Sequence, residues 1–252
     1  MPQSAPSAGS RFASDCGRSV TSTAGIETSK AEDEQALPQA VRLRITEIFY
    51  SLQGETSRVG LPTVFIRLTG CPLRCGYCDT AYAFHGGSMM SIAEVVDQVA
   101  QYAPRHVTVT GGEPLAQRAC HDLLRALCDR GWSVSLETSG ALDVSAVDPR
   151  VSRIVDIKTP GSNEVERNLW ENLEHLGMHD EIKFVLCGEA DYDWAKQVMV
   201  ERSLAGRCPV LFSPSYHDLP AAQLAGWILR DRLPVRMQLQ LHKQLWGEAQ
   251  GR

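Results

Sequence analysis

The sequence lacks any long apolar stretch. No segment of its 252 residues approaches the roughly 18 consecutive apolar residues that a membrane span requires, and the first residues, MPQSAPSAGSRFASD, lack the apolar run of a signal peptide. An excess of basic residues is also absent, since the net charge is −5 at pH 7, whereas nucleic-acid binding leaves a basic footprint. We therefore expect a cytoplasmic protein that acts on a small molecule, with neither a membrane nor a nucleic acid as its partner.

The cysteines do not form a disulfide framework. Five of the eight are scattered, namely Cys16, Cys120, Cys128, Cys187 and Cys208, and the other three, Cys71, Cys75 and Cys78, lie close together. In a reducing cytosol, scattered cysteines are usually small buried hydrophobes, whereas a tight cluster more often binds metal or does redox chemistry. We expect the five to pack in the interior and the three to carry chemistry.

Large apolar residues are scarce over residues 1–40, which end in the charged run Lys30 to Glu34. Such a segment cannot bury enough surface to offset its chain entropy. We expect a disordered tail over 1–40 and a single domain over 41–252. Because the globular pattern begins at Val41, the tail is hypothesised to be an extension that arises from a misassigned start or from cloning, which mass spectrometry of the native protein would test.

Strand-like and helix-like segments alternate after Val41. Strands are expected over 43–50, 63–69, 106–110, 133–137, 153–157, 182–186, 209–212 and 236–241. Helices are expected from Ser91, where Ser-Ile-Ala-Glu forms a capping box, and over about 115–130, 165–176, 191–204 and 219–232. The alternation predicts an α/β fold with a mainly parallel sheet and outer helices. About 210 residues are few for eight βα units, so we expect a partial barrel of about six strands.

The clustered cysteines lie in the segment GCPLRCGYCDT (70–80), directly after the expected strand TVFIRLT. Folds of this type place their chemistry at the carboxyl ends of strands. A structural zinc site wants four ligands, and neither Asp79 nor His85 completes a familiar spacing. A 4Fe-4S cluster held by three cysteines keeps one iron open for another ligand. The spacing alone leaves both kinds of site possible.

A second motif, Thr110-Gly111-Gly112-Glu113-Pro114, follows another expected strand. Its glycines allow close backbone approach to a ligand, and its carboxylate can accept hydrogen bonds from an ammonium group. On its own the motif is also typical of an ordinary turn. Together with the cysteine loop it resembles the radical S-adenosylmethionine (SAM) superfamily. The resemblance implies that Cys71, Cys75 and Cys78 hold a 4Fe-4S cluster.

The same resemblance implies a binding site for SAM. Tyr77, Cys78 and Asp79 would contact its nucleoside, and Gly112 and Glu113 would receive its methionine ammonium. The implied fold is a partial (β/α)6 radical SAM barrel with outer helices.

Further segments narrow the resemblance. IFYSLQGE (48–55), Arg67, CDT (78–80), ETSG (137–140), VDIKTP (155–160) and LHKQLWG (241–247) are similar to the 7-carboxy-7-deazaguanine synthase family, over about Val41 to Gly247. That resemblance implies a lyase of queuosine and deazapurine biosynthesis. Its substrate would be 6-carboxy-5,6,7,8-tetrahydropterin, from which a 5′-deoxyadenosyl radical removes the hydrogen at C6 before the ring contracts with loss of ammonia, assisted by Mg²⁺.

The resemblance also implies roles for single residues. The residues that would contact the substrate are Leu52, Gln53, Gly54, Glu55, Arg67, Thr110 and His242. Thr80 would bind Mg²⁺. Further contacts to SAM would come from Glu137, Ser139, Lys158 and Ser213. Arg67 offers a planar fork to a carboxylate, and Gln53 and Glu55 suit an amino-pyrimidinone edge.

Structural roles without a ligand stay open for several of these residues. Arg67 could lie on the surface, and Gln53 and Glu55 could be solvated turn residues. Thr80 could cap a helix, Lys158 could merely pair with Asp156, and His242 could be a structural residue on a strand.

The ending Glu248 to Arg252 departs from the Pro- or Gly-rich ending expected to close over a substrate, which puts closure by the C-terminus in doubt.

Two alternative functions remain at this point. A glycyl-radical-enzyme activase would bind a protein loop in place of a pterin, and would not need the LQGE, Arg67 and CDT set. A structural zinc-binding module would bind zinc and no iron. For the leading interpretation, the family resemblance implies a homodimer and a flavodoxin or ferredoxin as reductant.

Overall fold

The computed structural model describes residues 41–247 and 249–251, all within the unit Ala36–Arg252. The expected tail over 1–40 lies outside the described residues. Within the described part of the chain, no helix is long and apolar enough to cross a membrane.

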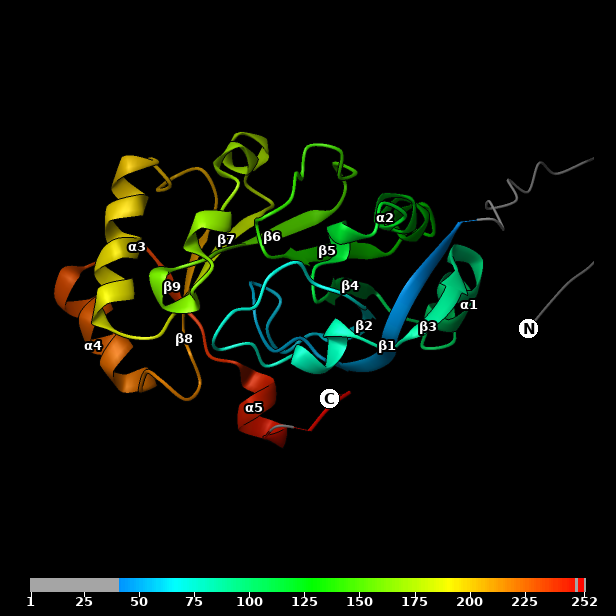
Figure 1. Ribbon diagram of the computed structural model, residues 1–252, viewed down its shortest axis with the longest axis horizontal. Coiled ribbons are helices and arrows are strands. Elements are labelled where there is room, and N and C mark those ends of the chain that lie inside the picture. The colour runs from blue at the N-terminus through cyan, green and yellow to red at the C-terminus, as the bar shows by residue number, and fades with distance from the viewer. Residues whose placement is uncertain (1–40, 248, 252) are drawn as a thin grey trace, which may run out of the picture. The chain divides into compact units, whose positions relative to one another are not determined.

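One nine-stranded sheet forms the framework (Figure 1). Its strands are β1 (Arg42–Leu52), β2 (Pro62–Leu68), β3 (Ser88–Ser91), β4 (His106–Gly111), β5 (Ser133–Thr138), β6 (Ser152–Ile157), β7 (Glu181–Leu186), β8 (Val210–Pro214) and β9 (Arg236–Met237). They lie in the order β3-β1-β2-β4-β5-β6-β7-β8-β9. Strands β2 and β4 to β8 are parallel. These six strands confirm the expected partial barrel.

The amino-terminal part of the sheet departs from the parallel pattern. Strand β1 pairs with β2 in antiparallel fashion, with Leu52 opposite Pro62, because the short segment between them allows a hairpin and holds no crossover helix. The sequence analysis missed β3, which pairs antiparallel with β1.

Five α-helices accompany the strands in the described residues. They are α1 (Ile92–Ala100), α2 (Cys120–Asp129), α3 (Glu189–Glu201), α4 (Ala221–Asp231) and α5 (Leu241–Trp246). Short 3-10 turns cover Ala81–Phe84, Pro114–Ala116, Pro160–Ser162, Val165–Arg167 and Trp170–His175. Ser91 caps α1 in the expected capping box with Glu94. Figure 1 shows α1 to α4 along the outside of the sheet and α5 apart from them.

Two expected elements were wrong. In place of a helix over 165–176 the chain makes 3-10 turns, because Asn168 and Asn172 bind backbone groups of neighbouring loops, such as Lys158 N at 2.8 Å and Leu142 O at 2.9 Å. In place of a strand over 236–241, β9 ends at Met237 and α5 begins at Leu241, so that His242 is helical. Gln238 N still donates to Phe212 O of β8 at 3.0 Å, and the side chain of Gln238 accepts a hydrogen bond from Thr56 N at 2.7 Å where the strand ends.

The outward faces of the strands build the apolar core. Val107 and Val109 of β4 and Val134 and Leu136 of β5 are almost fully buried in one cluster with the helices. The scattered cysteines Cys120, Cys128 and Cys208 are buried as expected, Cys187 is half-buried, and Cys16 lies outside the described residues.

Candidate functional site

Polar side chains occupy the inward faces of the same strands. Because side chains alternate along a strand, Thr108 and Thr110 of β4 point opposite to Val107 and Val109. The register places Arg67 of β2 beside Thr110, and Asp156 of β6 beside Lys183 of β7. Polar contacts extend across the interior, where Thr108 Oγ1 lies 2.9 Å from Ser135 Oγ. The interior of this partial barrel is therefore a polar chamber.

A cavity of about 650 Å³ opens from this interior. Most of the predicted site residues line it: Leu52, Gln53, Gly54, Glu55, Arg67, Cys71, Cys75, Tyr77, Cys78, Asp79, Thr80, Thr110, Gly112, Glu137, Ser139, Lys158 and His242. Two do not, since Glu113 and Ser213 are buried behind the wall. Ser215, two residues after Ser213, does line it. A role for Ser213 remains a prediction that the geometry does not support.

The cysteine loop follows β2 and is anchored by the Gly-Gly-Glu segment. Gly112 N donates to Leu68 O at 3.2 Å, and Glu113 N donates to Gly70 O at 2.8 Å. A Cβ on Gly112 would lie 2.3 Å from Gly70 O and 2.8 Å from Cys71 Cβ, which no side chain tolerates. The glycines therefore bring two loops together, a role in addition to the expected approach to a ligand.

The three clustered thiols are free and half-buried. Burial raises the pKa of Cys75 to about 11, partly offset by the Lys158 ammonium. Three sulfur ligands on one loop at a cavity wall suit a cluster that keeps one iron open.

Glu113 is fully buried beneath the wall and is satisfied by protein groups. Its carboxylate accepts hydrogen bonds from Thr138 Oγ1, from Ser139 N at 2.6 Å and from Leu115 N at 2.9 Å. It thereby joins the end of β4 to the end of β5, where Ser139 faces the cavity.

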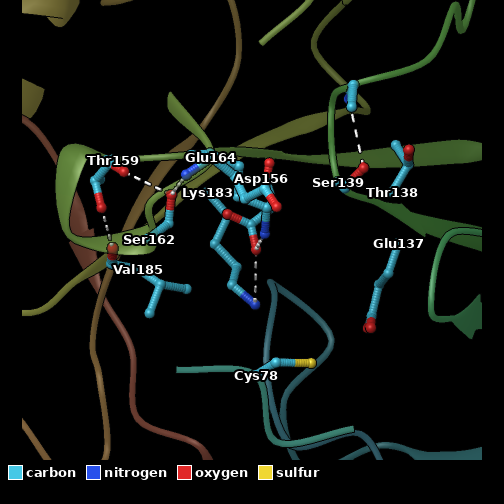
Figure 2. A network of polar contacts seen from close by, with 12 residues as sticks. Cys78, Glu137, Thr138, Ser139, Asp156, Thr159, Ser162, Glu164, Lys183 and Val185 are labelled. Carbon is cyan, nitrogen blue, oxygen red and sulfur yellow. Dashed lines mark hydrogen bonds and ion pairs between the residues drawn. The ribbon is translucent and has the colours of Figure 1, made fainter. Parts of the chain in front are cut away.

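Lys183, which the sequence analysis missed, lies near Asp156 (Figure 2) and interacts electrostatically with Glu55, Asp156 and Glu137. It forms an ion pair with Glu55, and its Nζ lies 3.9 Å from Asp156 Oδ2. Burial alone would raise the pKa of Glu55, but the Lys183 ammonium outweighs burial and lowers it. The pKa of Glu137 is raised, mainly by burial and then by the Glu55 charge. The sequence signal was a lysine between Ile182 and Phe184 of a buried strand, where the alternation turns it inward.

Arg67 is held on one side, which leaves the other side of its guanidinium for a ligand. Its Nε donates to Glu47 Oε1 at 2.7 Å, and Tyr82 Oη donates to the same oxygen at 2.7 Å. Phe49 and Tyr82 flank the group, with ring centroids 6.0 and 5.8 Å from Cζ. Because Arg67 lines the cavity, its remaining donors suit an anion.

Two buried polar atoms near the cysteine loop have no hydrogen-bond partner, Tyr77 Oη and Asp156 Oδ1. The other oxygen of Asp156 pairs with Lys158 Nζ at 3.1 Å, as the plainer interpretation of Lys158 expected. Burial, followed by the Asp156 charge, raises the pKa of Tyr77. Unpartnered buried atoms are costly unless another molecule satisfies them. This end of the cavity therefore suits a polar ligand.

The C-terminal helix contributes to the wall of the cavity. Asp79 Oδ2 contacts Lys243 Nζ at 3.4 Å and accepts a hydrogen bond from Gln240 Nε2 at 3.2 Å. A Cβ on Gly54 would lie 2.3 Å from His242 Nδ1, so only glycine lets α5 approach so closely. Ala249, Gln250 and Gly251 also line the cavity. The described residues of the C-terminus thus lie at the cavity wall, and closure over a substrate stays a prediction.

Known proteins resemble this chain along nearly all of the described part. Residues 65–158 match the radical SAM superfamily. The chain is 49% identical over 214 residues to a 7-carboxy-7-deazaguanine synthase of Chlorobaculum tepidum, covering 83% of this chain and 97% of the relative. A synthase of the same name from Koribacter versatilis is 42% identical, with 81% and 97% covered. The chain belongs to the 7-carboxy-7-deazaguanine synthase family.

Structural comparison agrees with that membership. The crystal structure of QueE from Escherichia coli superposes with a TM-score of 0.65 at 25% identity, covering 79% of this chain and 94% of that one. As a member of the 7-carboxy-7-deazaguanine synthase family, the chain is a radical SAM enzyme whose cofactors are a 4Fe-4S cluster and SAM. Membership also decides against the activase and the zinc module.

Proposed function

We propose that the chain converts 6-carboxy-5,6,7,8-tetrahydropterin to 7-carboxy-7-deazaguanine with loss of ammonia, in queuosine or deazapurine biosynthesis. The observation that carries the proposal is one cavity that joins three free cysteines to Arg67, Glu55 and His242. The first group suits a cluster, and the second suits a carboxylated, amino-substituted ring. The name of the relatives states the same product.

Cys71, Cys75 and Cys78 would hold the 4Fe-4S cluster. When bound and reduced, the cluster supplies the electron that cleaves SAM to methionine and a 5′-deoxyadenosyl radical. The predicted SAM contacts are Tyr77, Cys78, Asp79, Gly112, Glu113, Glu137, Ser139, Lys158 and Ser213, and the cavity lining supports all but Glu113 and Ser213 as direct contacts. The unpartnered oxygens of Tyr77 and Asp156 support a polar ligand here. Because Glu113 is already hydrogen bonded to Ser139, we propose that it acts by orienting Ser139 and the Gly-Gly-Glu segment that follows β4.

The substrate would lie deeper in the barrel, against Leu52, Gln53, Gly54, Glu55, Arg67, Thr110 and His242. Arg67 would bind the carboxylate at C6 through its free donors. Glu55, ionised beside Lys183, would accept N–H groups of the amino-pyrimidinone edge. Glu137 contacts Gln53 Nε2 at 3.2 Å and Thr110 Oγ1 at 3.1 Å, so it borders the substrate as well as the cofactor. Held between these contacts, C6 would be fixed for hydrogen abstraction.

Thr80 would bind Mg²⁺ together with oxygens of the substrate. Thr80 occupies the N-cap position of the turn Ala81–Phe84, but its hydroxyl makes no cap hydrogen bond, so the plainer capping role gains no support. It lines the cavity, 3.8 Å from Cys78 Sγ. Mg²⁺ binds few protein ligands when a substrate completes its octahedron.

We also propose that the enzyme works in the cytoplasm as a homodimer and takes its electron from a flavodoxin or ferredoxin. These proposals rest on the resemblance to the family. Size-exclusion chromatography with light scattering tests the dimer, and a monomer at micromolar concentration would contradict it.

The experiment that tests the function is anaerobic incubation of the reconstituted protein with SAM, dithionite, Mg²⁺ and the carboxytetrahydropterin. We expect both 5′-deoxyadenosine and 7-carboxy-7-deazaguanine by liquid chromatography with mass detection. Cys78→Ala should abolish both products and bind less iron, whereas Cys128→Ala, a core position in α2, should retain iron and activity. Absence of the deazaguanine from the iron-loaded wild type would overturn the proposal.

A further inference from the structure

The cysteine loop has a second support on the side opposite the Gly-Gly-Glu segment. Gly76 N, between Cys75 and Cys78, donates to Ser162 O at 3.0 Å. Arg74 N donates to the carboxylate of Glu164. A Cβ on Gly76 would lie 3.1 Å from Asn163 Nδ2, so the two segments touch directly. The segment 159–164, which we call the β6 loop, thus braces the backbone that carries two of the three thiols.

The β6 loop is rigid by its own hydrogen bonds. Ser162 donates to Thr159 O from both its amide, at 3.0 Å, and its hydroxyl, at 2.6 Å. Glu164 N donates to Ser162 Oγ at 3.1 Å. Figure 2 shows Thr159, Ser162 and Glu164 gathered in this turn near Lys183 and Asp156. Thr159 and Ser162 are fully buried. Because these bonds fix the loop internally, a shift of its first residues, Thr159 to Gly161, would also shift the cysteine loop.

The first residues of the β6 loop are hydrogen bonded to Asp191, which lies in the first turn of α3. One carboxylate oxygen accepts from Gly161 N at 2.8 Å, and the other accepts from Cys187 N at 2.9 Å and lies 3.0 Å from Thr159 Oγ1. Asp191 is 3% exposed. These donors and the amino end of the helix compensate the burial of its charge.

The contact between the β6 loop and Asp191 leaves no free space. A Cβ on Gly161 would lie 2.5 Å from Asp191 Oδ2 and 3.0 Å from Cys187 Cβ. A displacement of the carboxylate would therefore move the loop, and through Gly76 it would move the thiols.

We infer that Asp191 is a positioning residue for the iron–sulfur cluster, acting through the β6 loop on the backbone at Gly76. The inference rests on the proposed assignment of Cys71, Cys75 and Cys78 as cluster ligands. Asp191 does not line the cavity among the described residues, so its effect reaches the cluster through the protein alone.

Asp191→Asn tests this role in the anaerobically reconstituted full chain. Asparagine keeps the shape of the side chain but turns an NH₂ group toward one of the backbone donors, so at least one hydrogen bond is lost. We expect iron release to a chelator to become about 5-fold faster, which corresponds to about 1 kcal/mol. We also expect changed g-values in the electron paramagnetic resonance spectrum of the reduced cluster.

The matched control is Asp193→Asn, two residues further along α3, where the carboxylate is 63% exposed and contacts Lys196. This control should release iron at the wild-type rate. If Asp191→Asn fails to fold, Glu164→Gln weakens the other end of the brace, with the exposed Glu166→Gln as its control. We expect Glu164→Gln to change iron release in the same direction.

The outcomes separate this inference from the proposed function. A wild type that takes up no iron–sulfur cluster would contradict the proposed function. A wild type that takes up the cluster, with a folded Asp191→Asn or Glu164→Gln that keeps the same release rate and the same spectrum, would overturn the positioning role alone.

Discussion

Lys183 forms an ion pair with Glu55 inside the cavity, although the two residues lie 128 positions apart in the chain. The pair sets the charge of the substrate end. Burial raises the pKa of a carboxyl, and the ammonium beside Glu55 reverses that effect. Glu55 is therefore ionised at neutral pH, and its carboxylate can accept hydrogen bonds.

Removal of this ammonium tests its role. In Lys183→Met, burial and the neighbouring acidic groups would raise the pKa of Glu55. The acidic limb of kcat/KM against pH should move upward by about one pH unit, and the KM for the pterin should rise about 10-fold. Lys183→Arg, which keeps the charge, should restore most of the affinity, and Lys196→Met on the exterior of α3 should change neither. An unmoved acidic limb in Lys183→Met would argue against control of Glu55.

Substitution of Arg67 by lysine tests the carboxylate site. Lysine keeps the positive charge but cannot contact Glu47 and a carboxylate at once with fixed geometry. We expect the KM for the pterin to rise about 10- to 100-fold, as for a lost hydrogen bond between charged groups. Arg44→Lys, on an exposed part of β1, is the control and should leave KM unchanged. An equal KM in the two variants would remove Arg67 from the site.

A methyl group at Gly112 should separate the two loops that meet there. Because it would lie 2.3 Å from a backbone oxygen, Gly112→Ala should destabilise the protein by about 2 kcal/mol or more and lower its iron content. Gly226→Ala, within α4 and with open space at its Cβ, should instead stabilise the protein by about 0.5 to 1 kcal/mol. Urea unfolding and iron analysis compare the two, and a neutral Gly112→Ala would contradict the close contact.

Loss of the Thr80 hydroxyl should weaken dependence on Mg²⁺. Thr80→Val keeps the shape of the side chain and removes the oxygen. We expect stimulation by Mg²⁺ to need about 10-fold more metal, while iron content stays at the wild-type level. Titration of Mg²⁺ against product formation measures this. Mg²⁺ stimulation at the wild-type concentration would refute the role of Thr80.

Much of the site was predictable from sequence because it lies at strand ends. The cysteine loop and Thr110 to Glu113 follow buried strands, and parallel strands bring their carboxyl ends to one rim. Gln53 and Glu55 likewise follow a strand, whereas the role of Arg67, within β2, came from the family resemblance.

The residues that the sequence did not reveal sit within strands or depend on distant contacts. Lys183 lies in the middle of β7, where its role depends on Glu55 from the loop after β1. Beyond Met237 the side chain of Gln238 binds Thr56 N, 182 positions earlier in the chain, and α5 then places His242 on a helix. The missing helix over 165–176 depends on Asn172 binding loop carbonyls about 30 residues away. Contacts between residues far apart in the chain do not change the local hydrophobic pattern, so a single sequence does not reveal them.

The placement of Ala249, Gln250 and Gly251 along the cavity wall has a practical consequence for work with this protein. An affinity tag fused after these residues would be tethered beside the cavity and would compete with substrate for the same space.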